Sequence, residues 1–144
     1  MEPSYIIENI TLEECLPLRR DVLWPLLHTQ DCIEAGDEDA THYGYCVDNK
    51  IISCLSVFFR TPERYQIRKF ATHAYYQNKG IGSILFTHVL KTLKQQQVQT
   101  VYLNARFTAV RFYEKFNFKR FDQEFTKNNV LFVPMEFDLR ALSL

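Results

Sequence analysis

The stretch from Phe70 to Ser83 contains the residues whose types and spacing are best suited to chemistry. A predicted strand ends at Thr72, and Gly80 and Gly82 then open a long amphipathic segment. The first amides of a helix lack partners inside the helix and carry partial positive charge, so they suit a phosphate group. The two glycines let the backbone approach such an anion closely, and Lys79 adds a positive charge. The pattern predicts a pyrophosphate cradle between a strand and a helix.

Two glycines also fit a plain turn that binds nothing, so the cradle was compared with two familiar nucleotide-binding loops. Lys79 precedes Gly80, and no lysine follows Gly82 as the G-x-x-x-x-G-K-[ST] loop requires. Leu85 occupies the place where G-x-G-x-x-G needs its third glycine. The segment therefore matches neither of these loops.

A more specific resemblance joins this segment to a second one. Gln77-x-x-Gly80-x-Gly82 resembles the acetyl-CoA signature Q/R-x-x-G-x-G/A of the GNAT acetyltransferase superfamily. Residues 109–118 (AVRFYEKFNF) resemble that family's A-x-x-F-Y-E-K-x-G-F segment. The two motifs have the right separation and strand–helix context, and the resemblance covers nearly the whole chain. Residues 18–25 (LRRDVLWP) are similar, more loosely, to a bacterial GNAT group of poorly defined substrate.

The chain departs from the family pattern at three places. His73 and Ala74 stand where many members have a residue followed by proline. Asn78 and Asn117 replace glycines, one in the loop and one after the last helix. Asparagine tolerates the left-handed backbone conformation better than other non-glycine residues, so we expect both turns to be preserved.

The resemblance implies an N-acetyltransferase that transfers acetyl from acetyl-CoA directly to an amine. In the family, the strand before the cradle splays from its neighbour, its backbone holds the pantetheine arm, and an amide there polarises the thioester carbonyl. Carried over by position, the expected acetyl-CoA-binding residues are Phe70, Ala71, Thr72, Gln77, Asn78, Lys79, Gly80, Ile81, Gly82, Ser83 and Asn104.

Two of the expected site residues have competing interpretations. Tyr113 falls on the family's frequent general-acid tyrosine, where a phenol would protonate the thiolate leaving group. Helical spacing alone also fits a core aromatic at this position. Asn104 could bond the pantetheine or the acceptor, or could begin a turn. Arg106 stands where many members carry Asn, and its contact with the cofactor is left open.

Gln66 and Arg68 lie on the strand that leads into the cradle and are expected to line the acceptor pocket. Arg68 would suit a carboxylate on the acceptor, or it could form a surface ion pair. A base must take the proton of an ammonium substrate, but no candidate is favoured by position. The candidates are Glu8, His42, Glu124 or relayed water.

Hydrophobic periodicity places these residues within a single domain spanning residues 1–144. Strands are expected at 5–10, 42–47, 51–59, 65–72, 101–103, 118–121 and 132–139, and helices after Thr11, over 82–95 and after Thr108. Thr11 and Glu14 have the spacing of a capping box. The predicted class is α+β, with helices on both faces of a mixed sheet. Its order is that of a GNAT fold, which implies a mostly antiparallel sheet of six to seven strands, splayed at the acetyl-CoA site.

Alternation along the strand over residues 65–72 would place every second side chain on one face. One face would carry Tyr65, Ile67 and Lys69, and the other Gln66, Arg68 and Phe70. The acidic segment over residues 29–40 has two interpretations, a solvated connection or an acidic rim for a cationic substrate.

Composition excludes several classes of function. The 144 residues include 17 basic and 17 acidic side chains, so a nucleic acid or an anionic membrane is not expected as partner. The four cysteines match no zinc pattern, and no metal is expected. The N-terminal residues MEPS lack the features of a signal peptide, so a cytoplasmic protein with reduced thiols is expected.

Several points stay open at this stage. The acceptor could be a small amine, an amino acid, a peptide or a protein lysine. A free sheet edge could pair with a second subunit to form a homodimer. The alternative to an enzyme is a non-catalytic acetyl-CoA sensor or interaction module with the same fold.

Overall fold

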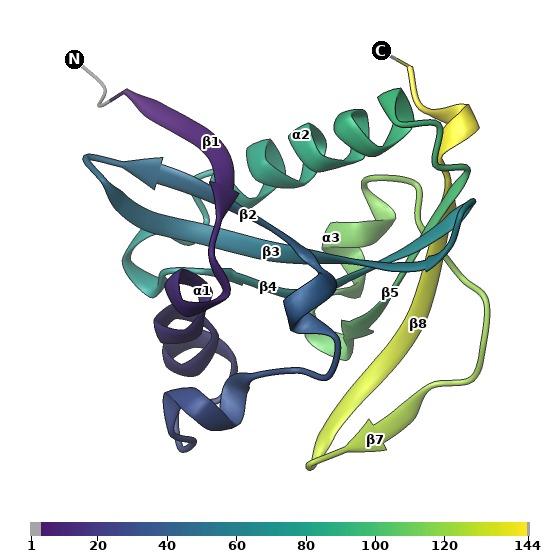
Figure 1. Cartoon of the computed structure of the whole chain (residues 1–144). Helices are drawn as coiled ribbons and strands as arrows, with labels where there is room; N and C mark the ends of the chain where they lie inside the picture. The colour runs from purple at the N-terminus through teal and green to yellow at the C-terminus, as the bar shows by residue number, and fades with distance from the viewer. Residues whose placement is uncertain (1–3, 144) are drawn as a thin grey trace.

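The β-branched and aromatic segments form one mixed sheet in the computed structural model, which describes residues 4–143 (Figure 1). Its strands are β1 (Tyr5–Ile10), β2 (Thr41–Val47), β3 (Lys50–Thr61), β4 (Arg64–Thr72), β5 (Thr100–Arg106), β6 (Lys119–Arg120), β7 (Phe125–Lys127) and β8 (Val130–Asp138). The spatial order is β1-β2-β3-β4-β5-β8-β6, with β7 on β8, and only the β4–β5 pair is parallel. The mixed, mostly antiparallel sheet is confirmed, with the short strand β7 added to the predicted set.

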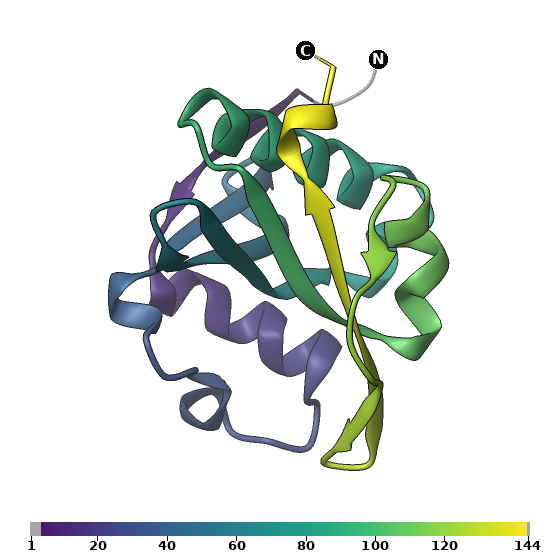
Figure 2. The same ribbon diagram turned by 90° about the vertical axis from the view of Figure 1, so that its right-hand side faces the viewer.

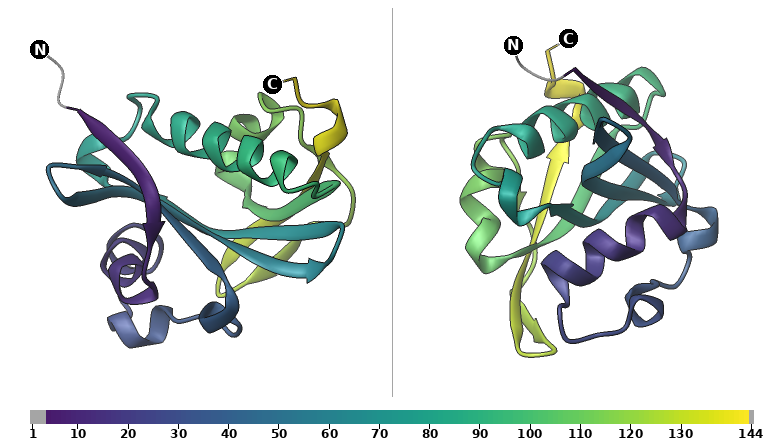
Figure 3. Two further views of the ribbon diagram at one scale, coloured as in Figure 1. Left: turned by 45° about the horizontal axis from the view of Figure 1, so that its top comes forward. Right: turned by 90° about the vertical axis from the view of Figure 1, so that its left-hand side faces the viewer.

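Helices lie on both faces of the sheet, as predicted. They are α1 (Leu12–Leu18), α2 (Ile81–Gln95) and α3 (Val110–Glu114), with a π-helical turn η1 (Arg19–Leu23) and 3-10 turns η2 (Thr29–Cys32), η3 (Asp37–Asp39), η4 (Ala74–Tyr76), η5 (Phe107–Ala109) and η6 (Leu139–Ala141). Two views show α2 on one face and α1 on the other (Figures 1 and 3). The main core forms under α2 and α3, and a smaller core, which includes buried free cysteines, forms under α1.

The first helix begins and ends for reasons that its sequence contains. The Thr11 hydroxyl accepts from the Glu14 amide at 3.1 Å, and the Glu14 carboxylate accepts from the Thr11 amide at 2.9 Å, which confirms the capping box. Pro17 lies inside α1 and removes one amide donor, and the chain continues as the wider turn η1. Trp24 leaves the helical conformation directly before Pro25, where the α region is disfavoured.

The strands β4 and β5 separate along their length. They pair only between Arg64–Gln66 and Thr100–Tyr102, whereas β5 stays paired with β8 as far as Arg106 (Figure 2). From Ile67 onward, the two strands therefore open a gap in the middle of the sheet. This geometry confirms the predicted splay.

A β-bulge in β4 overturns the predicted alternation. Cys54 pairs with Ala71 and Ser56 with Arg68, so Leu55 alone opposes Lys69 and Phe70. Lys69 adopts a left-handed conformation, with φ of 58°. The extra residue shifts every later side chain to the other face. Lys69 therefore lies on the same face as Arg68, where both contact Glu34. Phe70, predicted on that face, lies on the other one, and its ring stacks on Phe86 of α2 with 5.6 Å between centroids.

The strand β1 pairs only with β2 among the described residues. Within the described chain, the outer side of β1 is therefore an unpaired edge of the sheet. Because a second subunit could pair with such an edge, the homodimer stays a prediction.

Candidate active site

The loop between β4 and α2 presents a row of free amides. Asn78 and Gly80 adopt left-handed conformations, with φ of 63° and 79°, and so turn the chain into the helix. Ile84 is the first residue of the helix whose amide finds a backbone acceptor, the Gly80 carbonyl at 3.1 Å. Within the described part of the chain, the amides of residues 78–83 donate to no recorded partner. A Cβ at Gly80 would meet nothing within 4 Å, so the space beside this residue of the loop is open.

Side chains around this loop fix its shape. The Gln77 Nε2 donates to the Thr72 carbonyl at 2.9 Å, so this predicted residue ties the loop to the end of β4. His73 accepts from the Tyr75 amide at 3.1 Å and caps the turn η4. Lys79 places its ammonium 4.9 Å from the centroid of the Tyr75 ring. The loop is therefore ordered by local contacts.

Gly82 lies where the start of α2 packs against β4. A Cβ built at Gly82 would lie 3.4 Å from both Phe70 Cζ and Thr72 Oγ1. Most larger side chains would press against the strand at this point, and an acidic one would bring negative charge to the free amides. The end of β4, the loop and the helix terminus thus form one compact unit.

A cavity of about 340 Å³ lies where β4 and β5 separate. Of the residues predicted for the site, the structure gathers five around it: Gln66, Arg68, Phe70, Asn104 and Tyr113. Ala71 and Thr72 lie further along β4, and the loop residues 77–83 lie at the start of α2, outside the cavity lining. Phe70 connects the two parts, since it lines the cavity and also contacts the Gly82 position.

Tyr113 lines the cavity from α3 and is 8% exposed. Its ring meets Phe86 and Phe112 edge-on, at centroid distances of 5.5 and 5.2 Å. Its hydroxyl forms no hydrogen bond with any residue of 4–143. Burial raises the pKa of Tyr113 well above the usual value for a phenol. The hydroxyl therefore stays protonated and can donate a proton.

Asn117, after α3, confirms the prediction for its turn. It adopts a left-handed conformation with φ of 66°, and the Phe118 amide returns to the Tyr113 carbonyl at 3.2 Å. Asparagine at this place closes the helix in the way that glycine usually does. The turn fixes the end of the helix that carries Tyr113.

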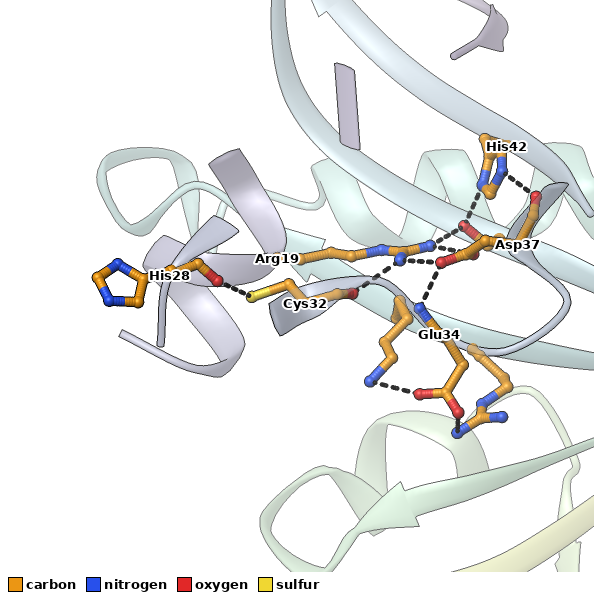
Figure 4. Close-up of polar contacts among 9 residues, drawn as sticks. Arg19, His28, Cys32, Glu34, Asp37 and His42 are labelled. Carbon is orange, nitrogen blue, oxygen red and sulfur yellow. Dashed lines mark hydrogen bonds and ion pairs between the residues drawn. The ribbon is translucent and has the colours of Figure 1, made fainter. Parts of the chain in front are cut away.

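A charged part of the cavity lining is built around Glu34. Its carboxylate lies 3.1 Å from Arg68 Nη2 and 3.2 Å from Lys69 Nζ (Figure 4). Burial alone would raise the pKa of Glu34, but Arg68 and Lys69 outweigh it and lower the pKa. Burial lowers the pKa of Lys69 despite the attraction of Glu34. One carboxylate is therefore shared by two cations.

A buried ion pair holds Glu34 in place. Arg19 is fully buried and donates to both carboxylate oxygens of Asp37, at 2.6 and 2.8 Å. The Asp37 carboxylate also accepts from the Glu34 amide at 2.6 Å, and Arg19 reaches the Cys32 carbonyl at 3.0 Å (Figure 4). Burial would raise the pKa of Asp37, but the hydrogen bonds from Arg19 and the Glu34 amide lower it. The acidic segment over 29–40 is thus anchored on the sheet.

Local sequence patterns did not predict this ion pair. Arg19 and Asp37 are 18 positions apart, so neither helical nor strand periodicity relates them. Arg19 follows buried Cys15, Leu16 and Leu18, and a cation among apolar helix positions was the signal for a buried acidic partner.

The three proposed bases lie away from the cavity lining. His42 is buried beside the ion pair, with Nδ1 2.6 Å from Ser56 Oγ and Nε2 3.0 Å from the Asp37 carbonyl. Glu8 lies on the edge strand β1, and Glu124 is exposed directly before β7. The acidic residues that do line the cavity are Asp31 and Glu34.

Two further polar residues serve as structural contacts. Gln66 Oε1 accepts from Arg60 Nε at 3.0 Å and from the Tyr102 hydroxyl at 3.2 Å. Arg106 donates to the Leu23 carbonyl at 2.8 Å, and its guanidinium lies 5.1 Å from the centroid of the Trp24 ring. Arg106, which lines the cavity, therefore links β5 to the turn η1.

Residues 4–143 contain no helix long and apolar enough to cross a membrane. The same residues bring together no group of three or more His, Cys, Asp or Glu side chains that could hold a metal ion.

Comparisons with known sequences place most of the chain in one family model. Residues 27–139 match the model described as an acetyltransferase (GNAT) domain. A Bacillus subtilis (strain 168) protein, called uncharacterized N-acetyltransferase YitI, is 27% identical over 127 residues. The alignment covers 83% of this chain and 85% of that protein.

Solved structures share the fold at low identity. A Lactobacillus plantarum protein superposes with a TM-score of 0.84 at 16% identity, covering 94% of this chain and 99% of that one. A GNAT family acetyltransferase from Elizabethkingia anophelis, solved with acetyl-CoA bound, superposes with a TM-score of 0.74 at 18% identity. That alignment covers 95% of this chain and 99% of the other.

Proposed function

This chain belongs to the GNAT acetyltransferase family, and we propose that it transfers the acetyl group of acetyl-CoA directly to the amine of a small-molecule or peptide acceptor. One observation carries the proposal. The free amides of residues 78–83 adjoin, through Phe70, a cavity that contains a protonated tyrosine. A phosphate-bearing thioester held at the amides can extend its reactive end toward Tyr113 in that cavity.

The residues of the loop fit the pyrophosphate of acetyl-CoA. They offer unpaired amide donors at a helix N-terminus, open space at Gly80 and the nearby charge of Lys79. When bound, acetyl-CoA supplies an activated acetyl thioester. We assign the pyrophosphate contacts to residues 78–83. Gln77 supports this loop through its hydrogen bond to the Thr72 carbonyl.

The backbone of β4 suits the pantetheine arm. The His73 amide donates to the Ile52 carbonyl of β3 at 2.7 Å. This bond determines which peptide groups at the end of β4 point toward β3. Peptide groups alternate in direction along a strand, so those of Thr72 point away from β3 toward the gap. Phe70 follows the left-handed Lys69 and lines the cavity, and we assign to its amide the polarisation of the thioester carbonyl. Asn104 faces the same cavity from β5.

The proposed transfer balances as follows. The neutral amine nitrogen attacks the thioester carbonyl carbon, a C–N bond forms and the C–S bond breaks. Tyr113 donates its hydroxyl proton to the departing thiolate. The amine nitrogen loses a proton to solvent, and the Tyr113 phenolate takes one back from solvent, so the enzyme is regenerated unchanged. Glu34 is held ionised by two cations and is a weak base, so the acceptor enters already deprotonated, in a fraction that rises with pH.

Two measurements test the proposal. Acetyl-CoA should raise the melting temperature, because it binds the folded state. A panel of small amines, amino acids and peptides, followed by thiol release, should then identify an acceptor. A melting shift without thiol release from any amine would indicate a non-catalytic acetyl-CoA-binding module, and no shift at all would contradict the proposal.

A further inference from the structure

The cavity has a local excess of positive charge. Six charged side chains line it, four basic and two acidic: Arg68, Lys69, Arg106, Lys127, Asp31 and Glu34. The whole chain has a formal net charge of zero, so the excess is a property of this place. The acidic rim for a cationic substrate, one of the two interpretations of the 29–40 segment, therefore does not form here.

The excess concentrates around Glu34. Its single carboxylate is shared by Arg68 and Lys69, which leaves one positive charge uncompensated at that contact. Lys127, from β7, adds a third positive charge that acts on the same carboxylate. Arg68 and Lys69 are only 24% and 16% exposed, so water screens them weakly. An anionic group entering the cavity would complete this cluster.

An apolar surface lies beside the cluster. Leu27, Ile33 and Phe125 line the same cavity, and they are 39%, 44% and 38% exposed. Phe125 stacks on Phe132 with 5.5 Å between ring centroids, and both residues line the cavity. Large apolar side chains left open next to a few convergent polar groups are typical of a small-molecule site.

The third feature is the position of the reacting end. Tyr113 and Phe70 line the cavity from α3 and from β4 beyond the bulge, whereas Lys127 and Phe125 come from the hairpin of β7 and β8. That hairpin projects to the same side of the sheet as α1 and the 29–40 segment (Figures 1 and 2). An acceptor therefore meets a reacting end, a cationic cluster and an apolar surface in one cavity.

We infer that the acceptor is a free amino acid with an apolar side chain, acetylated on its α-amine; this inference rests on the proposed function. The carboxylate meets Arg68, Lys69 and Lys127, and the side chain lies against Leu27 and the other apolar residues. The α-amine attacks the acetyl carbon as described above, with the thiol and the N-acetyl amino acid as products. Polyamines are repelled by the cluster, and protein lysines lack the adjacent carboxylate.

The test compares three matched acceptors, L-leucine, L-leucinamide and 3-methylbutylamine. The rate of thiol release is measured with each of them. Rates are compared per concentration of neutral amine, because the three amines differ in basicity. We expect kcat/KM for leucine to exceed that for the other two by about tenfold or more, the scale of a hydrogen bond to a charged group. Glycine, which keeps the carboxylate but lacks the side chain, should be a poorer acceptor than leucine.

Two variants test the carboxylate contact and the apolar contact separately. Lys127→Gln should raise KM for leucine by about three- to tenfold and leave KM for leucinamide unchanged. Phe125→Ala should raise KM for leucine and leucinamide alike, but not for glycine. Lys91→Gln, an exposed lysine of α2 outside the cavity, is the control and should change none of these constants.

The outcomes distinguish this inference from the proposed function. Thiol release from leucinamide or 3-methylbutylamine as efficient as that from leucine would overturn the amino-acid assignment and leave the acetyltransferase standing. A peptide or protein amine preferred over every free amino acid would do the same. Failure of every amine would remove the proposed function and this inference together.

Discussion

The two ends of the candidate site are built in different ways. The cradle consists of backbone amides from one continuous stretch, residues 78–83, shaped by left-handed Asn78 and Gly80. The proposed acceptor end consists of side chains from segments far apart in the chain, held by a buried ion pair and a bulge. A site made of backbone depends on few residue identities, whereas a site made of side chains depends on many.

The largest expected effect is at the cradle. Gly82→Glu places a side chain 3.4 Å from Phe70 and Thr72 and adds negative charge beside the free amides. We expect it to abolish the melting shift that acetyl-CoA causes. His88→Glu, on an exposed position two turns along α2, introduces the same charge and should keep the shift. A full shift in folded Gly82→Glu would remove the cradle from the cofactor site.

The second effect is on stability at the acceptor end. Asp37→Ala leaves Arg19 buried without its partner, and we expect a loss of about 3–5 kcal/mol in the free energy of unfolding by urea. Asp39→Ala, an exposed residue of the same turn, should change it by less than about 0.5 kcal/mol. Because the cradle is built separately from this ion pair, we expect acetyl-CoA still to raise the melting temperature of folded Asp37→Ala. Loss of that shift would show that the two ends are not independent.

The same pair predicts a pH dependence of stability. The folded-state pKa of Asp37 is lowered, so its stabilising contribution is complete above the unfolded pKa of about 3.9 and is lost as pH falls through the folded value. The stability difference between the parent and Asp37→Ala should therefore shrink in acid below about pH 4. A difference that stays constant down to the acid transition would contradict the assigned ion pair.

The third effect is on chemistry. Tyr113→Phe removes only the hydroxyl and should lower kcat by about 10²-fold or more while acetyl-CoA affinity and stability are kept. Because burial raises the pKa of Tyr113, kcat/KM of the parent should rise with pH and show no descending limb below about pH 10. Tyr75→Phe, a tyrosine that is 72% exposed, is the matched control. Turnover of Tyr113→Phe within about twofold of the parent would make Tyr113 a core aromatic only.

The smallest effect is at the ion pair that faces the acceptor. Arg68→Lys keeps the charge but loses the planar fork, and we expect KM for a carboxylate-bearing acceptor to rise by about three- to tenfold, with KM for acetyl-CoA unchanged. Arg140→Lys, on an exposed arginine distant in the sequence, should leave both constants alone. If KM for acetyl-CoA rises instead, or neither constant moves, Arg68 serves only to hold Glu34.

The contrast between the two ends also explains what the sequence could predict. The cradle depends on Gly80, Gly82 and a neighbouring helix, all within one local pattern, and its loop has the expected turns. The capping box at Thr11 and the turn at Asn117 were predictable for the same reason. Each of these features is set by residues a few positions apart.

The acceptor end required information that local patterns do not carry. An added residue at Lys69 reverses the facing of Phe70, and no neighbouring glycine signals the bulge. Arg19 and Asp37 meet only because α1 and the 29–40 segment pack on the same face. Lys127 and Phe125 reach the cavity through a short hairpin that propensity did not indicate.

Direct transfer between the two ends is tested by following the acetyl group itself. The enzyme is mixed with isotopically labelled acetyl-CoA and its best acceptor, and the acceptor, the released thiol and the intact protein mass are measured together over one turnover. We expect labelled N-acetyl product and free thiol to appear at the same rate and in equal amounts, with the protein mass unchanged. Label that first appears on the protein, or thiol released without acetylated amine, would contradict direct transfer.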